Sequence, residues 1–535
     1  MTLWFAGETF TDEERARLVP YFTDLEGPVF ALTNLPEVVK GALFARYSRT
    51  TKSLRRLFLD EFAEQLATGH APGLEGVKVD AAERLYERVF FEYGDDSVAQ
   101  LGGVHLACEQ ASQLLAKVIE RGRIAAYLEQ STRYLRYDDR PGGRLRLTVP
   151  PELAGTAAGE RYVEAAERTF AAYGAMFEPL AAYFRERFPK DAADPDPVYR
   201  ATITAKTCDA LRMLLPAGTR SNLGVYASGQ SYEQMLLRMR AHPLAEVRAY
   251  ADRILVELRK VIPAFLKRVD LEDRGVAWSR YLAETRVASA EIAARYTAGM
   301  EPGPRDLVTL TDYDPLGEEK VVAAALYAHT DLPDDRLGSL AHTMSGSERL
   351  AVLRAAIGDR GNRRHKPGRA FERTSYRFDV LCDYGAFRDL QRHRPMTIEW
   401  QRLSPAHGYE TPPAIEEAGL AGPWHDAMAD SAATWSVVAG EAGPDVAQYA
   451  VAMAYRVRFT MQMTARQAMH LIELRSSPQG HPTYRRVAQA MHDLIASTAG
   501  HRAIAAAMTY VSHEDVDLER LEAERRAAAR RDGSG

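Results

Sequence analysis

The stretch from Arg121 to Tyr134 reads RGRIAAYLEQSTRY and concentrates side chains that could hold a ligand. Its candidate ligands are three arginines, a carboxylate and a serine hydroxyl: Arg121, Arg123, Glu129, Ser131 and Arg133. The planar guanidinium of arginine suits two-point binding of a phosphate. The carboxylate and the hydroxyl could bond the polar edges of a ring or a sugar. Composition alone favours the simpler alternative, a solvated polar loop with surface ion pairs.

A second basic triplet, Arg392-His393-Arg394, stands 392 − 121 = 271 residues after the first, about half of the chain. Before it, Tyr376, Phe378 and Val380 alternate with polar residues, which predicts a strand. Because Pro395 follows the triplet, we expect it in a loop or at a strand end. There it could hold an anion or simply be solvated.

Each half of the chain opens on a short apolar run followed by a helical pattern. The first half has a predicted strand at 29–32 and a helix at 36–45. The second half has a predicted strand at 307–310 and a helix from Glu318. The Pro/Gly-rich segment 297–304 separates them. We therefore predict two domains, spanning residues 1–285 and 286–535.

Long helical patterns predict an α+β class in which helix predominates. They cover residues 157–188, 232–269 with a break near His242-Pro243, 427–438, 447–474 and the charged tail 518–531. The alternating run 145–150 predicts one further strand.

The segment Thr464–Arg475 places polar residues on a helix made otherwise of Met, Ala, Leu and Ile. Arg466 and His470 are four residues apart, so they share one face of that helix. This face could point toward a site. The alternative is a surface face with ordinary charge spacing, on which a lone histidine is more often structural than catalytic.

Bulk properties restrict the function. The chain has 535 residues, 46% hydrophobic and 26% charged, which is typical of soluble globular proteins. A net charge of −5 argues against broad binding to a nucleic-acid backbone. Three scattered cysteines, Cys108, Cys208 and Cys382, predict neither a disulfide framework nor a thiolate metal site, and we expect no metal.

The termini and the motif inventory add further expectations. Thr11–Glu14 looks like a helix capping box, not the start of a signal peptide, and no apolar run is long enough to span a membrane. We therefore expect a cytoplasmic protein. We find no phosphate-binding Gly-rich loop, HExxH or nucleophile elbow, so any chemistry must come from a cofactor that the protein positions.

These motifs together resemble the flavin-dependent thymidylate synthase family. The family signature is R-H-R, seven residues and a serine, within N-E-x-S-x-R-Y; the chain has R-G-R, seven residues and Ser131. Tyr93–Val98 is similar to the family's Y-G-H-x-S-V, and Leu211–Pro216 to its A-R-x-x-L-P. In the second half, Arg392–Arg394 keeps the triplet and Thr464–Arg475 resembles N-x-R-x-x-x-H-F-x-x-L-R.

Each half departs from the family pattern at different positions. The first half has Gly122 and Asp95 where the family has histidines, and Gln100-Leu101 where it has Glu-His. The second half has substitutions at the asparagine–glutamate pair, the signature serine, both later arginines and the helix asparagine; these are Glu399-Trp400, Arg402, Ser404, Gln448 and Thr464. Neither half keeps a full set, and the losses are complementary.

The resemblance implies two tandem copies of the family fold, a small mixed sheet with long helices. It implies reductive methylation of dUMP to dTMP, with FAD as cofactor and NADPH and methylenetetrahydrofolate as co-substrates, and no protein nucleophile. The implied nucleotide ligands are Glu129, Ser131, Arg133, Arg212 and Arg475; the implied cofactor ligands are Arg121, Arg123, Arg392, His393, Arg394, Arg466 and His470. Since family sites combine several subunits, we expect a homodimer whose sites combine both halves.

Three alternatives remain open at this stage. The chain could be an inactive paralogue that binds nucleotide or flavin, or serves only in assembly. It could methylate another pyrimidine nucleotide. It could bind nucleic acid through the arginine-rich segment 121–146, although the negative net charge disfavours this reading.

Overall fold

The computed structural model describes residues 8–47, 50–64, 100–192, 194–303 and 305–514. The chain forms two compact units. Unit 1 comprises residues 1–109, 124–129 and 222–299, and unit 2 comprises 110–123, 130–221 and 300–535. Each unit thus combines segments that are far apart in the sequence.

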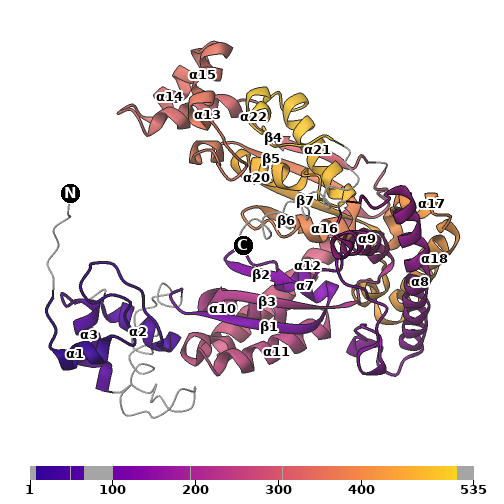
Figure 1. Cartoon of the computed structure of the whole chain (residues 1–535), viewed down its shortest axis with the longest axis horizontal. Coiled ribbons are helices and arrows are strands. Elements are labelled where there is room, and N and C mark those ends of the chain that lie inside the picture. The colour runs from indigo at the N-terminus through magenta and orange to yellow at the C-terminus, as the bar shows by residue number, and fades with distance from the viewer. Residues whose placement is uncertain (1–7, 48–49, 65–99, 193, 304, 515–535) are drawn as a thin grey trace. The chain divides into compact units, whose positions relative to one another are not determined.

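Two antiparallel sheets share one strand arrangement (Figure 1). The first has the order β1-β3-β2, formed by β1 (Gly103–Ser112), β2 (Ala125–Glu129) and β3 (Arg220–Ser228). The second has the order β4-β5-β7-β6, formed by β4 (Val308–Tyr313), β5 (Ser375–Asp383), β6 (Thr397–Trp400) and β7 (Arg456–Thr464). The set β5-β7-β6 therefore repeats β1-β3-β2.

The strand register is repeated as well. Ala126 pairs with Tyr226 in the first sheet, and Thr397 pairs with Gln462 in the second. The offsets are 397 − 126 = 271 and 462 − 226 = 236 residues. Because a slip of one residue would invert every side chain, identical register indicates two copies of one fold.

The helices that follow matching strands also correspond. The helix α7 (Gln113–Ile119) matches α16 (Tyr384–Leu390) at an offset of 271, and α10 (Gly229–Arg240) matches α20 (Ala465–Arg475) at 236. Each of the four begins with a side-chain N-cap, from Ser112, Asp383, Ser228 and Thr464 respectively. These caps satisfy N–H groups that a first helical turn leaves unpaired, so they fix where each helix starts.

Within unit 2, the two copies meet through a backbone ladder with pseudo-twofold symmetry. Ala217 N–H donates to the Val451 carbonyl at 2.8 Å, and Met453 N–H donates to that of Leu215 at 3.0 Å. These two bonds exchange under the 236-residue offset. A second matched pair runs from Gly218 N–H to Tyr449 and from Ala454 N–H to Met213, at 2.9 Å each.

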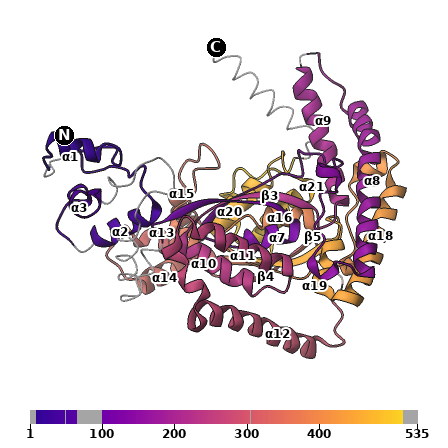
Figure 2. The ribbon, with the colours of Figure 1, turned by 90° about the horizontal axis from the view of Figure 1, so that it is seen from below.

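The long helices α8 (Ala157–Arg187) and α18 (Ala421–Ala442) lie side by side in unit 2, as both ribbon views show (Figure 2). Arg168 binds Asp430 through two hydrogen bonds of 2.9 and 3.1 Å, and Ala158 N–H donates to Glu441. The apolar faces of both helices are buried. This packing reinforces the joint made by the ladder.

The remaining helical elements complete the two units. They are α1 (Asp12–Leu18), α2 (Glu37–Tyr47), α3 (Leu54–Glu61), η2 (Pro141–Gly143), η3 (Pro151–Leu153), α9 (Asp196–Leu211), η4 (Arg212–Leu214), α11 (Ala245–Arg259), η5 (Pro263–Asp270), η6 (Glu272–Val276), α12 (Ala277–Thr297), α13 (Gly317–Tyr327), α14 (Asp334–Thr343), α15 (Gly346–Ile357), η7 (Arg369–Glu372), η8 (Pro405–His407), α17 (Pro413–Glu417), α19 (Pro444–Ala447), η9 (Gln448–Ala450), α21 (Pro482–Ser497) and α22 (Arg502–Ala506).

Most predicted elements are confirmed. Thr11 and Glu14 form the capping box of α1. The helix predicted at 36–45 is α2, and the strand and helix of the second half are β4 and α13. The predicted tandem α+β fold is therefore correct. The domain boundary at 285/286 and the association of two chains stay predictions, and Tyr93–Val98 and the tail 518–531 lie outside the described residues.

Three predicted elements are wrong. Residues 145–150 form only one bridge, Leu147 to Thr219, because Pro150 and Pro151 lack N–H donors and start a 3-10 turn instead. The predicted strand at 29–32 is likewise reduced to a bridge between Leu32 and Phe22. The helix predicted at 447–474 is interrupted by β7, which pairs with β5 on one side and β6 on the other and buries alternate side chains.

No helix among the described residues is long and apolar enough to cross a membrane.

We predict that Gly218→Ala destabilises the joint between the copies. A Cβ at this position would lie 2.0 Å from the Tyr162 hydroxyl, which is itself bonded to the Thr148 carbonyl. Overpacking of this kind costs about 1–3 kcal/mol. Urea or thermal unfolding measures the change. Gly224→Ala is the matched control, because a Cβ there meets nothing within 4 Å; equal stability of both variants would contradict the prediction.

Candidate functional site: an arginine–aspartate network

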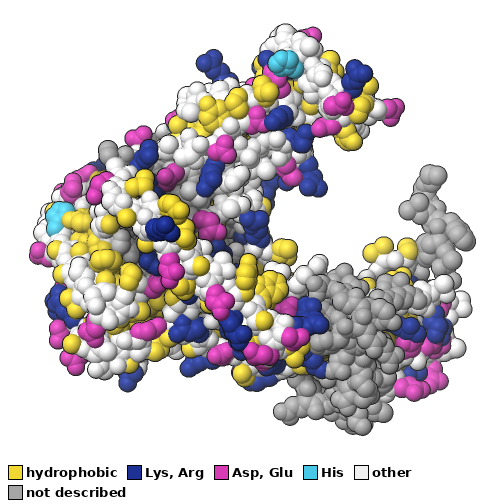
Figure 3. All heavy atoms as spheres, turned by 180° about the vertical axis from the view of Figure 1, so that it is seen from behind, with side chains coloured by type: hydrophobic (Ala, Val, Ile, Leu, Met, Phe, Trp, Pro, Cys, Tyr) yellow, Lys and Arg dark blue, Asp and Glu magenta, His cyan; other side chains and the backbone are white. Residues whose placement is uncertain are grey.

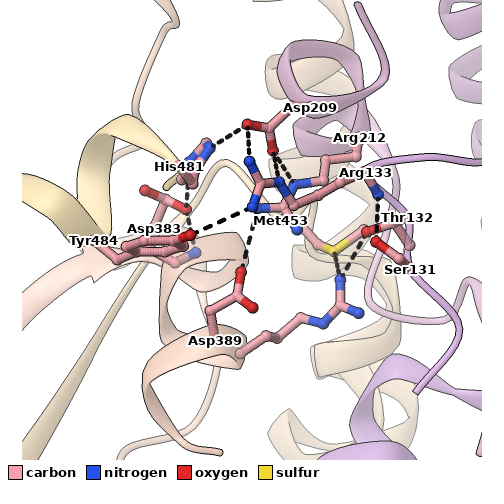
Figure 4. A network of polar contacts seen from close by, with 12 residues as sticks. Ser131, Thr132, Arg133, Asp209, Arg212, Asp383, Asp389, Met453, His481 and Tyr484 are labelled. Carbon is pink, nitrogen blue, oxygen red and sulfur yellow. Dashed lines mark hydrogen bonds and ion pairs between the residues drawn. The ribbon is translucent and has the colours of Figure 1, made fainter. Parts of the chain in front are cut away.

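Four arginines from both sequence halves converge on two aspartates in unit 2. Figure 4 shows two of these arginines, Arg133 and Arg212, with Asp209 and Asp389. The first half supplies Arg133, from the loop after β2, Asp209, from the last turn of α9, and Arg212, from η4. The second half supplies Asp389, from α16, Arg392, from the loop after it, and Arg475, from the end of α20. The 213–218 ladder lies next to Arg212 in the chain, so it helps to fix where the two sets meet.

Asp209 is the first centre of the network. The Arg133 Nε atom lies 3.0 Å from Asp209 Oδ1, and the Arg133 Nη2 atom donates to Oδ2 at 3.2 Å. Arg212 Nε lies 3.1 Å from Oδ1, and His481 Nδ1 lies 3.2 Å from Oδ2. Arg133 also donates to the Tyr484 hydroxyl at 3.3 Å. One carboxylate thereby orients two guanidinium groups.

Asp389 is the second centre, and its contacts are longer. Its carboxylate oxygens lie 3.8 Å from Arg212 Nη2, 3.6 Å from Arg392 Nη1 and 3.9 Å from Arg475 Nη1. Charge-assisted hydrogen bonds between such groups are normally about 2.7–2.9 Å long. The three guanidinium groups are therefore attracted electrostatically to the Asp389 carboxylate, but at these distances they do not form hydrogen bonds with it.

Arg212 is the least satisfied member of the network. Its side chain is 3% exposed, yet within the described residues neither Nε nor Nη2 has a hydrogen-bond partner. A buried donor without an acceptor costs about 1–3 kcal/mol, and more when it is charged. Arg212 is thus ion-paired with Asp209 and Asp389 without a well-formed hydrogen bond from Nε or Nη2 within the described residues, so these N–H groups could donate to an anionic ligand.

The network's charges support each other. Burial would raise the pKa of Asp209, but Arg133, His481 and Arg212 outweigh it and hold that pKa well below its usual range. Burial likewise opposes ionisation of Asp389, but Arg212, Arg475, Arg392 and Arg133 lower its pKa to about 2. Both carboxylates are thus ionised at neutral pH.

His481 extends the network toward Asp383. Its Nε2 atom lies 3.9 Å from Asp383 Oδ1, while its Nδ1 faces Asp209. Asp383 is fully buried and caps α16 by accepting from Ala386 N–H at 2.7 Å. Burial raises the pKa of Asp383. His481 therefore connects the helix that carries Asp389 with the carboxylate that holds Arg133.

A second basic group adjoins the network through Arg475. Arg475 Nε donates to His393 Nε2 at 2.8 Å, and the His393 ring packs edge-on against His470 at a centroid distance of 5.7 Å. Burial and the neighbouring cations lower the pKa of His470 to about 4, the cations being Lys366, Arg363, Arg475 and Arg466. Burial and Arg475 also hold the pKa of His393 well below its usual range. Both rings are neutral at pH 7.

The other predicted ligands lie in varied environments. Ser131 Oγ accepts from Arg133 N–H at 3.3 Å, so it adjoins the network. Glu129 is buried at the end of β2 in unit 1. Arg121 pairs with Glu399 at 2.7 Å, and Arg123 donates to Thr397 at 3.0 Å. Both of these contacts are made with β6. Arg394 is half-buried in the loop before β6.

The pseudo-equivalent positions in the other copy have lost four of these six residues and keep Arg121, which matches Arg392, and an aspartate. At the matching offsets, Ser404 replaces Arg133, Gln448 replaces Arg212, Val118 replaces Asp389 and Met239 replaces Arg475. Asp445, which matches Asp209, pairs instead with Arg402 at 2.8 Å. The duplication thus keeps one arginine network and not its counterpart.

Sequence reasoning missed Asp209, Asp389, His481 and Tyr484. Asp209 precedes Arg212 by three residues and Asp389 precedes Arg392 by three, a spacing that brings side chains together on a helix. That spacing was an available signal for both aspartates. The sequence held no comparable signal for His481 and Tyr484, because only the fold brings them to Asp209 and Arg133.

A protein-family comparison settles the family. The model for thymidylate synthase complementing protein matches residues 42–264 and again residues 309–500. The chain belongs to this family. The two matches cover most of the chain and correspond to the two copies of the sheet.

Members similar along nearly the whole chain are UPF0159 proteins. That of Chlamydia muridarum is 35% identical over 97% of this chain and 99% of its own length. That of Chlamydia pneumoniae is 36% identical, over 97% and 98%. That of Thermoplasma acidophilum is 31% identical, over 91% and 97%. The tandem form is therefore shared by family members from distant organisms.

Two solved structures of the Helicobacter pylori flavin-dependent thymidylate synthase, both with FAD and dUMP, are also similar. They are 17% identical to this chain. The match to one covers 35% of this chain and 93% of the solved chain, with a TM-score of 0.26. The match to the other covers 38% of this chain and 98% of the solved chain, with a TM-score of 0.28.

We predict that this family member loses stability as the pH falls from about 6.5 toward 4. His470 and His393 have pKa values below 6.5 in the folded state, so the unfolded chain binds protons more strongly in this range. His470→Gln should flatten the decline, measured as urea midpoints at several pH values. His329→Gln, at an exposed position, is the control and should leave the decline unchanged.

Proposed function

We propose that the chain is a flavin-dependent thymidylate synthase that methylates C5 of dUMP. Methylenetetrahydrofolate supplies the carbon, and NADPH supplies the reducing equivalents. Family membership supports the class of enzyme. The arginine–aspartate network supports a nucleotide monophosphate as substrate.

The buried Arg212 carries this proposal, because its Nε and Nη2 groups have ion-pair partners but no hydrogen-bond acceptor among the described residues. Four guanidinium groups, Arg133, Arg212, Arg392 and Arg475, surround two carboxylates, Asp209 and Asp389, which leaves 4 − 2 = 2 positive charges. A phosphate monoester carries about −1.5 to −2 charges near neutral pH. The excess charge of the network therefore matches one nucleotide phosphate.

The side chains around Arg212 are better suited to binding a nucleotide in one orientation than to binding a free phosphate ion. Ser131 and Tyr484 place hydroxyl groups beside Arg133, and Arg475 lies 5.2 Å above the Tyr484 ring. These side chains can bond the sugar or the base edge while the arginines hold the phosphate. Fixed arginines would hold the substrate in a reactive position without moving during the reaction.

The basic group around His470 fits the anionic part of a flavin dinucleotide. Arg466 is tied to the Pro367 carbonyl and to Glu372, but no ion pair among the described residues involves Arg363 or Lys366. The pKa of Lys366 is lowered by burial and by Arg466 and Arg363, which indicates like charges without a counterion. Arg363, Lys366 and Arg466 would hold the pyrophosphate, with Arg392, His393 and Arg394 beside them. FAD, when bound, carries the hydride.

No cysteine of this chain is suited to act as a nucleophile. Cys108, Cys208 and Cys382 are all buried. Burial raises the pKa of Cys108 and of Cys208 to about 11, and that of Cys382 well above its usual range. Thiols in this state stay protonated at neutral pH and are poor nucleophiles. This agrees with a reaction in which flavin, and not a protein thiolate, activates the transfer.

The preservation of one network favours one nucleotide site per chain. The counterpart position offers Ser404 and Gln448 in place of two arginines, so it lacks the charge to hold a phosphate. A non-catalytic paralogue whose remaining network only binds a ligand would show the same losses. Activity and binding therefore have to be measured separately.

The reaction is tested by tritium release from C5-labelled dUMP in the presence of FAD, NADPH and methylenetetrahydrofolate. We expect release that depends on all three and on the enzyme. If the folded, flavin-loaded protein releases no more tritium than the enzyme-free control, the thymidylate synthase proposal is wrong. Running labelled dCMP in parallel tests methylation of another pyrimidine nucleotide.

The substrate site is tested by calorimetric titration of dUMP. We expect about one dUMP per chain, since only one network is kept. Arg133→Ala and Arg212→Gln should weaken binding by about 2–5 kcal/mol, because each leaves buried charge unpaired. Arg394→Ala should chiefly weaken the binding of FAD rather than that of dUMP. The matched control is Arg146→Ala, whose arginine pairs with Asp139 outside the network and should leave binding unchanged.

Either of two results would contradict the site assignment. One is unchanged dUMP affinity in both Arg133→Ala and Arg212→Gln. The other is two equivalent dUMP sites per chain, because the Ser404–Gln448 position would then have to bind the nucleotide as well.

A further inference from the structure

We propose that His492, Asp493 and His513 form a binding site for a divalent transition-metal ion of the zinc type. His492 and Asp493 lie on α21, and His513 lies in the segment after α22; all three belong to unit 2. One ligand atom from each residue lies within 4.8 Å of the other two. The site is separate from the arginine network and does not depend on the proposed reaction.

The His492 ring is oriented as a metal ligand. Its Nε2 atom lies 3.2 Å from the Ala505 carbonyl oxygen. A carbonyl can only accept, so Nε2 carries the proton, and in the neutral ring the Nδ1 lone pair is left available. Within the described residues, Nδ1 is buried and has no hydrogen-bond partner. Metal-binding histidines commonly donate their other N–H to a backbone carbonyl in this way.

The other two side chains are within reach of the same ion. Asp493 Oδ1 lies 3.5 Å from His492 Nδ1, and the ring centroids of His492 and His513 are 5.4 Å apart. Two ligands of a tetrahedral zinc ion lie about 3.3 Å apart, given bond lengths of about 2.0–2.1 Å. The distance between His492 and Asp493 nearly meets this requirement. Asp493 and His513 are exposed, so their side chains can rotate to close the remaining separations.

The backbone beside His513 is held in place without the metal. Ser512 N–H donates to Ser476 Oγ at 3.2 Å, and the Ser512 carbonyl accepts from Gln489 Nε2 at 2.9 Å. The Glu514 carbonyl accepts from Arg485. The segment that carries His513 is therefore ordered beside α21, and binding loses little conformational entropy.

The donor set determines the class of ion. Two imidazoles and one carboxylate suit Zn²⁺, Co²⁺ or Ni²⁺, whereas Mg²⁺ and Ca²⁺ prefer oxygen ligands alone. Three protein ligands leave coordination positions for water. Because the ion would join α21 to the segment after α22, its effect is to clamp this end of unit 2.

The test uses the untagged full-length protein, since a histidine tag would itself bind metal. Co²⁺ is titrated and followed by its visible absorption bands, and Zn²⁺ is added to displace it. We expect about one Co²⁺ per chain in a site of low symmetry. His492→Ala and His513→Ala should each weaken Co²⁺ binding by at least about tenfold. Zn²⁺ should raise the thermal midpoint of the wild type and not that of His513→Ala.

His329→Ala is the matched control, because it removes an exposed histidine outside the cluster and should leave Co²⁺ binding unchanged. His513 is exposed, so its removal should not unfold the chain, and circular dichroism checks this. Equal Co²⁺ affinity in the wild type and the His513→Ala variant would overturn the proposal, and so would the absence of Co²⁺ binding to the wild type.

Discussion

Four backbone hydrogen bonds between segments 213–218 and 449–454 set how the two copies of the fold meet in unit 2. Backbone groups carry no side-chain identity, so this ladder survives divergence of the two sequences. Arg212 stands at one end of the first segment, and Met453 of the second segment contacts the buried Arg388 guanidinium at 3.2 Å. The position of the arginine network therefore follows from a joint that the network does not itself make.

Duplication in one chain removes a constraint that identical subunits impose. In a symmetric oligomer, one substitution changes every equivalent site at once. In this chain the copies diverge independently, so one position keeps Arg133, Arg212 and Asp389 while its counterpart has Ser404, Gln448 and Val118. The complementary motif losses are consistent with a single composite site.

The visible face in Figure 3 shows Lys and Arg side chains mixed with Asp and Glu over the described surface. The four arginines of the network, by contrast, are gathered in unit 2, where their charge is only partly balanced by Asp209 and Asp389. Burial strengthens these interactions, because little water is present to screen them. A chain with a net charge of −5 can thus carry a local group of positive charge.

The sequence alone determined the tandem fold and singled out candidate ligands in the first half, because strand alternation, helix periodicity and the spacing from Arg121 to Arg133 are local properties. It also showed that neither half has a complete motif. Only the tertiary structure brought Asp389 to Arg212 and His481 to Asp209, since these contacts join residues far apart in the chain. The strand β7, predicted as helix, was decided in the same way, because pairing with β5 and β6 outweighs local preference.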